Sequence, residues 1–415
     1  MPIFELDNIP TNNKMIFFHR HRHKSHRKGS TLQTTVFAIV AVATVFLPDI
    51  YIWDNYISNT TETFGAIMWW TPASLIVCTM LMWKSGRWHN LLLRTFFGLA
   101  LCTVLPKLIF TIISVVGRGL ATVWSPLGNV ADIAAVVIAY ASLCAFAYGL
   151  TIGWRKLTIK EDTLTFDNLP KAFDGYKILQ FSDLHVGTFR SDKKFVKKLV
   201  KAINSQNADL IVFTGDLVNV HPGELHPYLN VLNNLHARDG IYSILGNHDY
   251  CEYRHYRAKD GASKNVDKLK KMEMDFGWNL LLNEFTTIER DCEKITLIGV
   301  ENYGKPPFKS YSDLTKAMDG TDKEGFKILL SHDPAHWNSE ITTDTDIDLT
   351  LSGHTHAMQL RIGRFSPAKW SSKEWGGIYR NGRQVLCVSS GIGGTMPFRL
   401  GAWPEINVIT LKRSI

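Results

Sequence analysis

Residues 178–185 read Ile-Leu-Gln-Phe-Ser-Asp-Leu-His, a short apolar run that ends in an aspartate and a histidine, Asp183 and His185. Continuously apolar runs of this length are typical of strands that are covered on both faces. Functional side chains in α/β proteins gather at strand ends, because the backbone there is rigid and the following loop is free to vary. The same arrangement recurs further along the chain at Gly215-Asp216, Gly246-Asn247-His248-Asp249, Ser331-His332-Asp333 and Gly353-His354-Thr355-His356. We therefore expect one site that is built from several strand ends.

The side chains in these motifs have the chemistry of a metal site. One residue separates Asp183 from His185, and one separates His354 from His356, so each pair lies on one face of an extended segment. The glycine before Asp216 lets the backbone turn tightly, and a carboxylate at that point can bridge two cations. The candidate ligands are Asp183, His185, Asp216, Asn247, His332, His354 and His356. This set is large enough for two divalent ions with open positions for water and phosphate. Mixed oxygen and nitrogen ligands suit manganese, iron, zinc or cobalt better than magnesium or calcium.

The chain has 415 residues, enough for two domains, and its composition changes along its length. Long apolar stretches dominate the sequence up to about residue 150, whereas the rest resembles an ordinary globular protein.

Much of the net charge of +8 lies in the segment 19–28 and in short loops beside apolar stretches, which favours anionic lipid head groups as partners. No basic and aromatic nucleic-acid-binding motif is present, so we expect no nucleic acid partner. The six cysteines form no CxxC pair, which favours a reducing compartment.

Four stretches are long and apolar enough to cross a bilayer, which takes about 20 residues. They are residues 34–53, 64–83, 95–116 and 131–150. Lysines and arginines lie mainly in the N-terminal tail, in the loop after the second stretch and after the fourth, so the positive-inside rule predicts that both termini are cytoplasmic. The predicted organisation is a basic cytoplasmic tail (1–30), a transmembrane helical domain (31–154) and a catalytic domain (155–415).

Lys107 lies within the third of these stretches and has two interpretations. A charge inside a membrane is a candidate functional residue. A long lysine side chain can also reach the outer interface of the bilayer with its charged end.

The segment from residue 155 onward alternates predicted strands with a predicted helix. The helix covers residues 191–204, with Ser191 or Asp192 as the N-cap and an apolar stripe that includes Phe195 and Leu199. The expected strands are 156–160, 163–166, 176–181, 210–213, 241–245, 295–300, 327–330, 349–351 and 384–388. This alternation predicts an α/β domain with a sheet core and helices outside.

The combined motifs resemble those of the calcineurin-like metallophosphoesterase superfamily, and within it the membrane-associated phosphodiesterase branch of bacteria. The resemblance covers about residue 177 to the end of the chain, including a closing glycine-rich segment at 390–395. That segment lacks the lysine of a phosphate-binding loop, so we interpret it as a turn that closes the fold. The resemblance implies an α/β fold in which a β-sandwich is flanked by helices and the metals lie at strand ends.

The resemblance also implies roles for individual residues. One metal would be held by Asp183, His185, Asp216 and His356, and the other by Asp216, Asn247, His332 and His354. His248 would donate a proton or hydrogen bond to the phosphoryl or leaving oxygen, and Asp249 would orient its ring. The implied reaction is in-line attack on phosphorus by a metal-bridging hydroxide, without a covalent intermediate.

The resulting functional hypothesis is a membrane-anchored dinuclear phosphoesterase of the bacterial inner membrane that cleaves a phosphodiester or pyrophosphate bond. A lipid-linked substrate, such as a UDP-linked acylated sugar, is one alternative and a broad phosphodiesterase is the other. The segment 250–264 follows the His248 motif and is interpreted either as a lid or membrane-facing entrance to the site, or as an exposed loop. The sequence identifies no protein partner. A non-catalytic membrane scaffold and a transporter with a regulatory phosphoesterase domain are the alternatives from other classes.

Overall fold

The computed structural model describes residues 24–59, 63–84, 90–190, 192–253, 256, 258, 260–305 and 309–414. Most of the expected basic tail and Ser191 therefore lie outside the described residues. Contacts divide the chain into two compact units. The first comprises Met1–Arg87 and Thr103–Ala139, and the second comprises Trp88–Cys102 and Tyr140–Ile415. After the roles expected from the sequence, we call them the membrane unit and the catalytic unit. The proposed three-part division of the chain stays a prediction.

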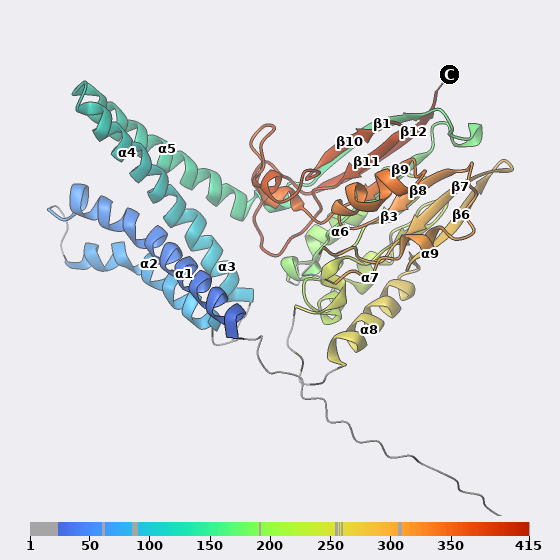
Figure 1. The fold of residues 1–415 in the computed structure, drawn as a ribbon, viewed down its shortest axis with the longest axis horizontal. Coiled ribbons are helices and arrows are strands. Elements are labelled where there is room, and N and C mark those ends of the chain that lie inside the picture. The colour runs from blue at the N-terminus through green and yellow to red at the C-terminus, as the bar shows by residue number, and fades with distance from the viewer. Residues whose placement is uncertain are drawn as a thin grey trace, which may run out of the picture. The chain divides into compact units, whose positions relative to one another are not determined.

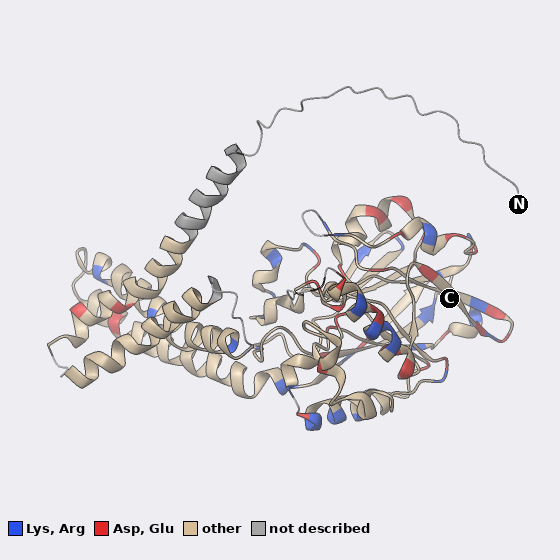
Figure 2. Ribbon diagram, turned by 90° about the horizontal axis from the view of Figure 1, so that it is seen from below, with Lys and Arg blue, Asp and Glu red and all other residues tan. Residues whose placement is uncertain are grey.

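Within the described residues, four helical segments are long and apolar enough to cross a membrane, as expected. They are Ala38–Ile57, Thr63–Met82, Leu91–Ala121 and Pro126–Arg155. The corresponding helices are α1 (Lys24–Ile52), α2 (Thr63–Lys84), α3 (Asn90–Leu99), α4 (Leu105–Ala121) and α5 (Pro126–Thr151). A π-helical turn at Ala100–Val104 joins α3 to α4, so these two helices form one span. Figure 2 shows that charged residues are sparse on these helices and frequent on the strands and helices that follow.

Two groups of polar side chains in the membrane unit are paired within it. The Lys107 ammonium donates to Asp49 Oδ1 at 2.5 Å and lies 3.8 Å from the centre of the Trp69 ring. Asp132 Oδ1 accepts hydrogen bonds from the hydroxyls of Tyr56 and Ser114, each at 2.7 Å. Lys107 thus has a partner inside the bundle, and its side chain does not have to reach the outer interface.

The strands of the catalytic unit form two six-stranded sheets among the described residues (Figure 1). The first sheet has the order β1-β12-β2-β3-β4-β5 and the second has the order β10-β11-β9-β8-β7-β6. The strands are β1 (Thr158–Phe166), β2 (Lys177–Phe181), β3 (Leu210–Phe213), β4 (Ile241–Ser243), β5 (Asn279–Leu280), β6 (Glu284–Arg290), β7 (Glu293–Gly299), β8 (Phe326–Leu330), β9 (Leu349–Ser352), β10 (Gly377–Asn381), β11 (Gln384–Val388) and β12 (Glu405–Arg413).

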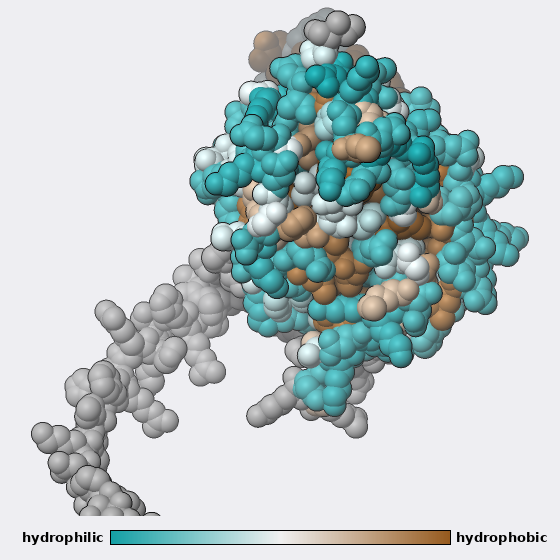
Figure 3. Space-filling model, turned by 90° about the vertical axis from the view of Figure 1, so that its right-hand side faces the viewer, coloured by the Kyte–Doolittle hydropathy of each residue, from teal (hydrophilic) through white to brown (hydrophobic). Residues whose placement is uncertain are grey.

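Three layers of apolar side chains hold this unit together. A central layer lies between the sheets, with alternate residues such as Ile178 from the first sheet and Ile328 from the second. A second layer packs α6 (Lys193–Asn204), α7 (Leu229–Leu232) and α8 (Gly261–Asp275) against the first sheet. A third packs α9 (Leu314–Met318) against the second sheet. Figure 3 shows a face that is mostly hydrophilic, with hydrophobic side chains visible mainly in a hollow near its centre. The expected β-sandwich flanked by helices, preceded by apolar helices, is confirmed.

Several elements differ from the expectation. The two predicted strands 156–160 and 163–166 form a single strand, β1, whose successive residues alternate between a more exposed and a more buried face. The helix α6 begins one residue after Asp192, whose carboxylate accepts a hydrogen bond from Lys194 N at 3.0 Å. Strands β5, β6, β10 and β12 and helix α8 were not predicted. Strands β6 and β10 lie at edges of the second sheet and carry exposed polar residues, so their apolar signal is weak.

The strand directions place the sequence motifs at one end of the sandwich. Strands β2, β3 and β4 are parallel neighbours in the first sheet, and β8 and β9 are parallel neighbours in the second. Parallel strands end on the same side of a sheet, so the loops that follow them are neighbours. The Gln180 amide in β2 donates to the carbonyl of Ser352 in β9 at 2.9 Å, which joins the two sheets at this end.

The last turns of α5 belong to the catalytic unit and pack against its C-terminal segment. Arg399 N donates to Gly149 O at 3.2 Å, and the rings of Phe146 and Phe398 lie 6.4 Å apart. A Cβ at Gly149 would lie 2.6 Å from the Phe398 ring, so only glycine allows this approach. The end of the fourth span is therefore packed tightly against the sheet domain.

Candidate metal centre

Each candidate ligand follows a strand of the sandwich. Asp183 and His185 follow β2, Asp216 follows β3, and Asn247 follows β4. His332 follows β8, and His354 and His356 follow β9. The second sheet thus supplies three imidazoles, and the first sheet supplies both carboxylates, the amide and one imidazole. The site lies where the ends of the two sheets meet.

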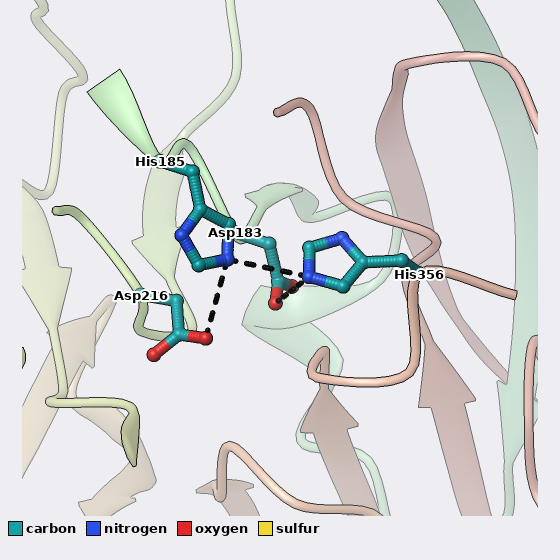
Figure 4. Close-up of side chains that lie close together, drawn as sticks. All are labelled: Asp183, His185, Asp216 and His356. Atoms are coloured by element: carbon teal, nitrogen blue, oxygen red, sulfur yellow. Dashed lines mark hydrogen bonds and ion pairs between the residues drawn. The ribbon is translucent and has the colours of Figure 1, made fainter. Parts of the chain in front are cut away.

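The first group of side chains comprises Asp183, His185, Asp216 and His356, whose ligand atoms lie within 4.8 Å of one another (Figure 4). His185 Nε2 is 3.4 Å from Asp216 Oδ2 and 3.3 Å from His356 Nε2. His356 Nε2 is 3.4 Å from Asp183 Oδ1. Figure 4 shows all four side chains directed toward a common point.

The second group shares Asp216 with the first. Asp216, His332 and His354 also place ligand atoms within 4.8 Å of one another. Asn247 Oδ1 lies 3.2 Å from His332 Nε2 and 3.0 Å from His354 Nδ1. The structure therefore brings all seven predicted ligand residues together, in the two groups that the family resemblance implies.

The ligand atoms of the site are better placed to bind divalent ions than to form hydrogen bonds with one another. His185 Nε2 faces His356 Nε2 at 3.3 Å, and His354 Nδ1 faces His332 Nε2 at the same distance. A hydrogen bond between two such nitrogens requires one ring to donate an N–H and the other to accept it, whereas a divalent ion can take a lone pair from each ring. Imidazole lone pairs and carboxylate oxygens that converge in a buried space are the ligand set of a transition metal. The residues present therefore fit the metal ions that the resemblance implies.

The backbone at the ligands is strained. The φ angles of Asp183, His185, Asp216, His354 and His356 are all positive, between 43° and 73°. Non-glycine residues rarely adopt positive φ, and each such residue costs on the order of 1 kcal/mol. Strain of this kind persists where the surrounding fold holds the residue in place, and it is concentrated at functional sites.

Gly215 is the glycine on which this geometry depends most. Its φ is 94°, and a Cβ at this position would lie 2.5 Å from Gly246 N and 2.8 Å from His332 Nδ1. The loops after β3 and β4 can approach His332 because Gly215 has no side chain.

Charges in the centre are strongly coupled. Burial alone would raise the pKa of Asp216, but the imidazoles of His332 and His248 outweigh it and hold this pKa well below its usual range. Burial alone would lower the pKa of His332. The negative charge of Asp216 outweighs this effect and raises the pKa of His332 to about 10. Metal binding to these residues is therefore expected to displace protons from the imidazoles.

The structure corrects the expected relation between His248 and Asp249. The carboxylate of Asp249 accepts hydrogen bonds from the backbone N–H groups of Gly246, Asp216, Leu217 and Val218, at 2.7 to 3.2 Å. His248 Nδ1 instead donates to the carbonyl of Asn219 at 2.7 Å. Asp249 thus fixes the loops after β3 and β4, and Asn219 orients the His248 ring.

The protonation of His248 follows from its burial. Burial lowers the pKa of His248 to about 4, so the ring is neutral near pH 7. Because Nδ1 carries the proton donated to the Asn219 carbonyl, the other ring nitrogen is an acceptor. The centre of the ring lies 4.7 Å from that of His185, beside the metal-binding side chains.

Arg399 is a residue of the site that the sequence did not single out. It is 1 % exposed, and its guanidinium donates to the carbonyls of Ser390, Gly393 and Ala402 at 2.7 to 3.2 Å. It also lies 3.4 Å from His356 Nδ1. Arg399 holds the closing segment 390–395 against the first metal-binding group, which agrees with the interpretation of this segment as a closing turn. No periodicity marks a buried arginine whose partners are carbonyls, so only the resemblance of the segment pointed to it.

A cavity of about 590 Å³ opens beside the second metal-binding group. Asn247 and His354 lie in its wall together with Tyr253, Lys305 and Lys309. The loop after Asp249 thus borders this cavity, which agrees with the interpretation of its first residues as part of the entrance. Arg254, His255 and Arg257 of that loop lie outside the described residues.

Comparisons with known proteins give a consistent result. A family model described as calcineurin-like phosphoesterase matches residues 176–358. The chain is 31% identical over 276 residues to the uncharacterized metallophosphoesterase YkuE of Bacillus subtilis (strain 168), a match that covers 64% of this chain and 90% of that protein. It is 27% identical over 388 residues to the uncharacterized metallophosphoesterase Cj0846 of Campylobacter jejuni, which covers 91% of this chain and 87% of the other.

A third relative is a transmembrane protein with metallophosphoesterase domain from Danio rerio. It is 28% identical over 275 residues, which covers 64% of this chain and 60% of that protein. The chain therefore belongs to the calcineurin-like metallophosphoesterase family, as a member in which apolar helices of membrane-spanning length precede the phosphoesterase domain.

Proposed function

We propose that the chain is a membrane-anchored phosphoric ester hydrolase that uses two divalent metal ions to cleave a phosphodiester or pyrophosphate bond. The observation that carries the proposal is the convergence of seven side chains in two groups that share Asp216. Two ions that share a carboxylate are the arrangement that stabilises both the attacking and the leaving oxygen of a phosphoryl transfer.

Different residues of the site would bind the metal ions and contact the substrate. Asp183, His185, Asp216 and His356 would hold one ion, and Asp216, Asn247, His332 and His354 the other. The ions would be manganese, iron, zinc or cobalt, and they supply Lewis acidity to the phosphoryl group and to the attacking water. His248 would contact the phosphoryl or leaving oxygen, and Asn219 holds its ring in orientation.

The cavity beside the second group supports an ester with a sizeable leaving group. Lys305 can offset negative charge on the substrate, whereas Lys309 already pairs with Glu252, and Tyr253 offers an apolar ring with a polar end. Both features suit a second phosphate or a polar head group beyond the scissile bond.

The proposed location is the bacterial inner membrane, with the catalytic domain and both termini in the cytoplasm. The distribution of lysine and arginine around the spans supports this orientation. An alkaline phosphatase fused to the C-terminus, which is active only outside the cytoplasm, should therefore be inactive. An active fusion would contradict the orientation without affecting the proposed chemistry.

The central experiment uses the full-length protein in detergent, stripped of metal with a chelator and reloaded with manganese, iron, zinc or cobalt. The reloaded protein should hydrolyse members of a panel of soluble phosphodiesters, lipid pyrophosphates and phosphomonoesters. It should bind about two ions per chain by elemental analysis. Equal turnover by the metal-free protein, or reloaded protein that turns over nothing in the panel, would contradict the proposal. The second outcome would favour a non-catalytic scaffold.

A further inference from the structure

The segment 358–373 reads Met-Gln-Leu-Arg-Ile-Gly-Arg-Phe-Ser-Pro-Ala-Lys-Trp-Ser-Ser-Lys and combines exposed apolar side chains with positive charge. Ile362 and Trp370 are 67% and 79% exposed, and Met358 and Phe365 are also exposed. The segment contains two arginines and two lysines and no acidic residue. This composition is unusual for a surface that faces only water.

The apolar side chains are presented by a rigid local structure. Backbone hydrogen bonds of 2.8 and 3.0 Å join Ile362 and Phe365 in both directions and form a tight hairpin with Gly363 at its tip. The rings of Phe365 and Trp370 lie 5.6 Å apart and pack edge to face. Exposed aliphatic and aromatic side chains flanked by lysine and arginine are typical of elements that enter the interface of an anionic bilayer.

A chain of contacts links this segment to the end of the fourth span. Leu360 pairs with Leu400 in a β-bridge, and Arg361 N donates to Leu400 O at 2.8 Å. The preceding residue, Arg399, donates its backbone N–H to Gly149 O in α5. Gly149 lies fewer than two helical turns from Arg155, the end of the candidate span. The segment is thus held close to the point at which the chain leaves the bilayer.

The same segment forms part of the mouth of the candidate active site. It begins two residues after His356, and Met358, Ser371 and Ser372 contribute to the wall of the 590 Å³ cavity. His354 lies in the same wall. An element that touched the bilayer here would bring the entrance of the cavity to the lipid surface.

We propose that the segment 358–373 inserts Ile362, Phe365 and Trp370 into the interface of an anionic bilayer and opens the catalytic cavity toward that surface. The substrate would then be a lipid whose phosphoester head group enters the cavity while its apolar part stays in the bilayer. The delivery of a lipid rests on the proposed function, whereas the membrane contact does not.

The first experiment measures membrane contact independently of activity. Full-length protein in which the exposed Cys78, Cys144 and Cys292 and the partly exposed Cys102 are replaced by serine receives a single labelling site, Ile362→Cys. An environment-sensitive fluorophore is attached there, and the protein is placed in phosphatidylglycerol nanodiscs that contain lipids with nitroxide-labelled acyl chains. The matched control is Met274→Cys on α8, which is also 67% exposed.

The fluorophore at position 362 should be quenched by the nitroxide lipids several times more strongly than the fluorophore at position 274. Replacement of phosphatidylglycerol by a neutral lipid should reduce this difference, and so should the double variant Arg364→Glu/Lys369→Glu. Equal and weak quenching at the two positions would overturn the proposal. Protection of position 362 without quenching, together with a larger particle by light scattering, would instead identify a second copy of the chain as the occupant and would also overturn it.

The second experiment compares two substrates. Ile362→Glu/Trp370→Glu should lower hydrolysis of a phosphoester lipid embedded in nanodiscs at least tenfold, with unchanged hydrolysis of bis(p-nitrophenyl) phosphate in solution. Met274→Glu should change neither rate. Loss of both activities in the double variant would contradict lipid delivery. If the wild type cleaves neither substrate, the proposed function fails, and the quenching result still decides the membrane contact.

Discussion

In the membrane unit, Lys107 donates to Asp49, and the hydroxyls of Tyr56 and Ser114 donate to Asp132, so each of these buried groups has a complementary partner. In the candidate metal centre, buried groups of the same kind face each other instead. Nε2 of His185 and Nε2 of His356 lie 3.3 Å apart, and each lies 3.4 Å from a carboxylate oxygen. Complementary clusters stabilise a fold by themselves, whereas a cluster of convergent ligand atoms needs a further species to be satisfied. The comparison distinguishes paired polar side chains, which stabilise packing, from convergent ligand atoms, which fit a bound ion.

The largest expected effect comes from the residue that both metal-binding groups share. Asp216→Asn removes the charge that would bridge two cations, so it should lower kcat/KM for diester hydrolysis about 10³-fold or more. The metal-free variant should still unfold cooperatively on heating, which shows that it remains folded. Asp275→Asn, at an exposed position at the end of α8, is the control and should retain full activity. Full turnover by Asp216→Asn would contradict the proposal that these residues form the catalytic metal site.

A second change tests whether the hydrogen bonds of Arg399 stabilise the fold, as the paired side chains of the membrane unit do. Arg399→Met leaves the carbonyls of Ser390, Gly393 and Ala402 without this donor, which should lower the free energy of unfolding by about 2–4 kcal/mol. Thermal unfolding of the full-length protein in detergent measures the effect. Arg380→Met on the exposed strand β10 should be nearly neutral. Equal stability of the two variants would show that Arg399 is not a structural element of the closing segment.

Breaking the ion pair of the membrane unit should affect stability and spare catalysis. Asp49→Asn and Lys107→Met should each lower the free energy of unfolding by about 1–3 kcal/mol, because each leaves a buried partner uncompensated. The double variant should lose less than the sum of the two. Hydrolysis of a soluble diester should be unchanged in all three, and a large loss would point to a functional role for the pair.

The last prediction concerns the pH dependence of stability and a buried acid outside the site. Burial raises the pKa of Glu273 from 4.5 to about 8, and the nearby Asp249 carboxylate adds to this. The folded state therefore binds the Glu273 proton more tightly than the unfolded state does. The resulting stabilisation is complete below pH 4.5 and is lost as the pH rises to about 8. Glu273→Gln should flatten this part of the stability profile, which unfolding at several pH values measures. The exposed Glu161→Gln should leave the profile unchanged, and an unchanged profile for Glu273→Gln would contradict the assignment.

Much of the site could be predicted from the sequence because its residues follow apolar strands directly. The runs before Asp183, Asp216 and His332 are buried strands, and parallel neighbours bring their ends together without further information. The four spans were recognised for a similar reason, since length and apolar composition decide them. These features depend on local patterns.

The features that could not be predicted depend on long-range packing. The partner of Lys107 is 58 residues away, and the ring of His248 is oriented by Asn219, 29 residues earlier. Asp249 was expected to orient the ring of His248. In the structure its carboxylate instead accepts hydrogen bonds from four backbone N–H groups. Strand β12 pairs with β1 and β2, more than 200 residues earlier, so neither neighbour is visible in the local sequence.

The tight packing of α5 against the segment that carries Arg399 has a mechanical consequence. The hydrogen bond from Arg399 to Gly149 and the close approach of the Phe398 ring fix the last turns of α5 against the rest of the catalytic unit. Insertion of one residue into an α-helix rotates everything beyond it by about 100°. An insertion between Phe146 and Gly149 would rotate one of these residues relative to the other, so their contacts with Phe398 and Arg399 could not both be kept. Insertions or deletions there should therefore be tolerated far less well than in the exposed loops.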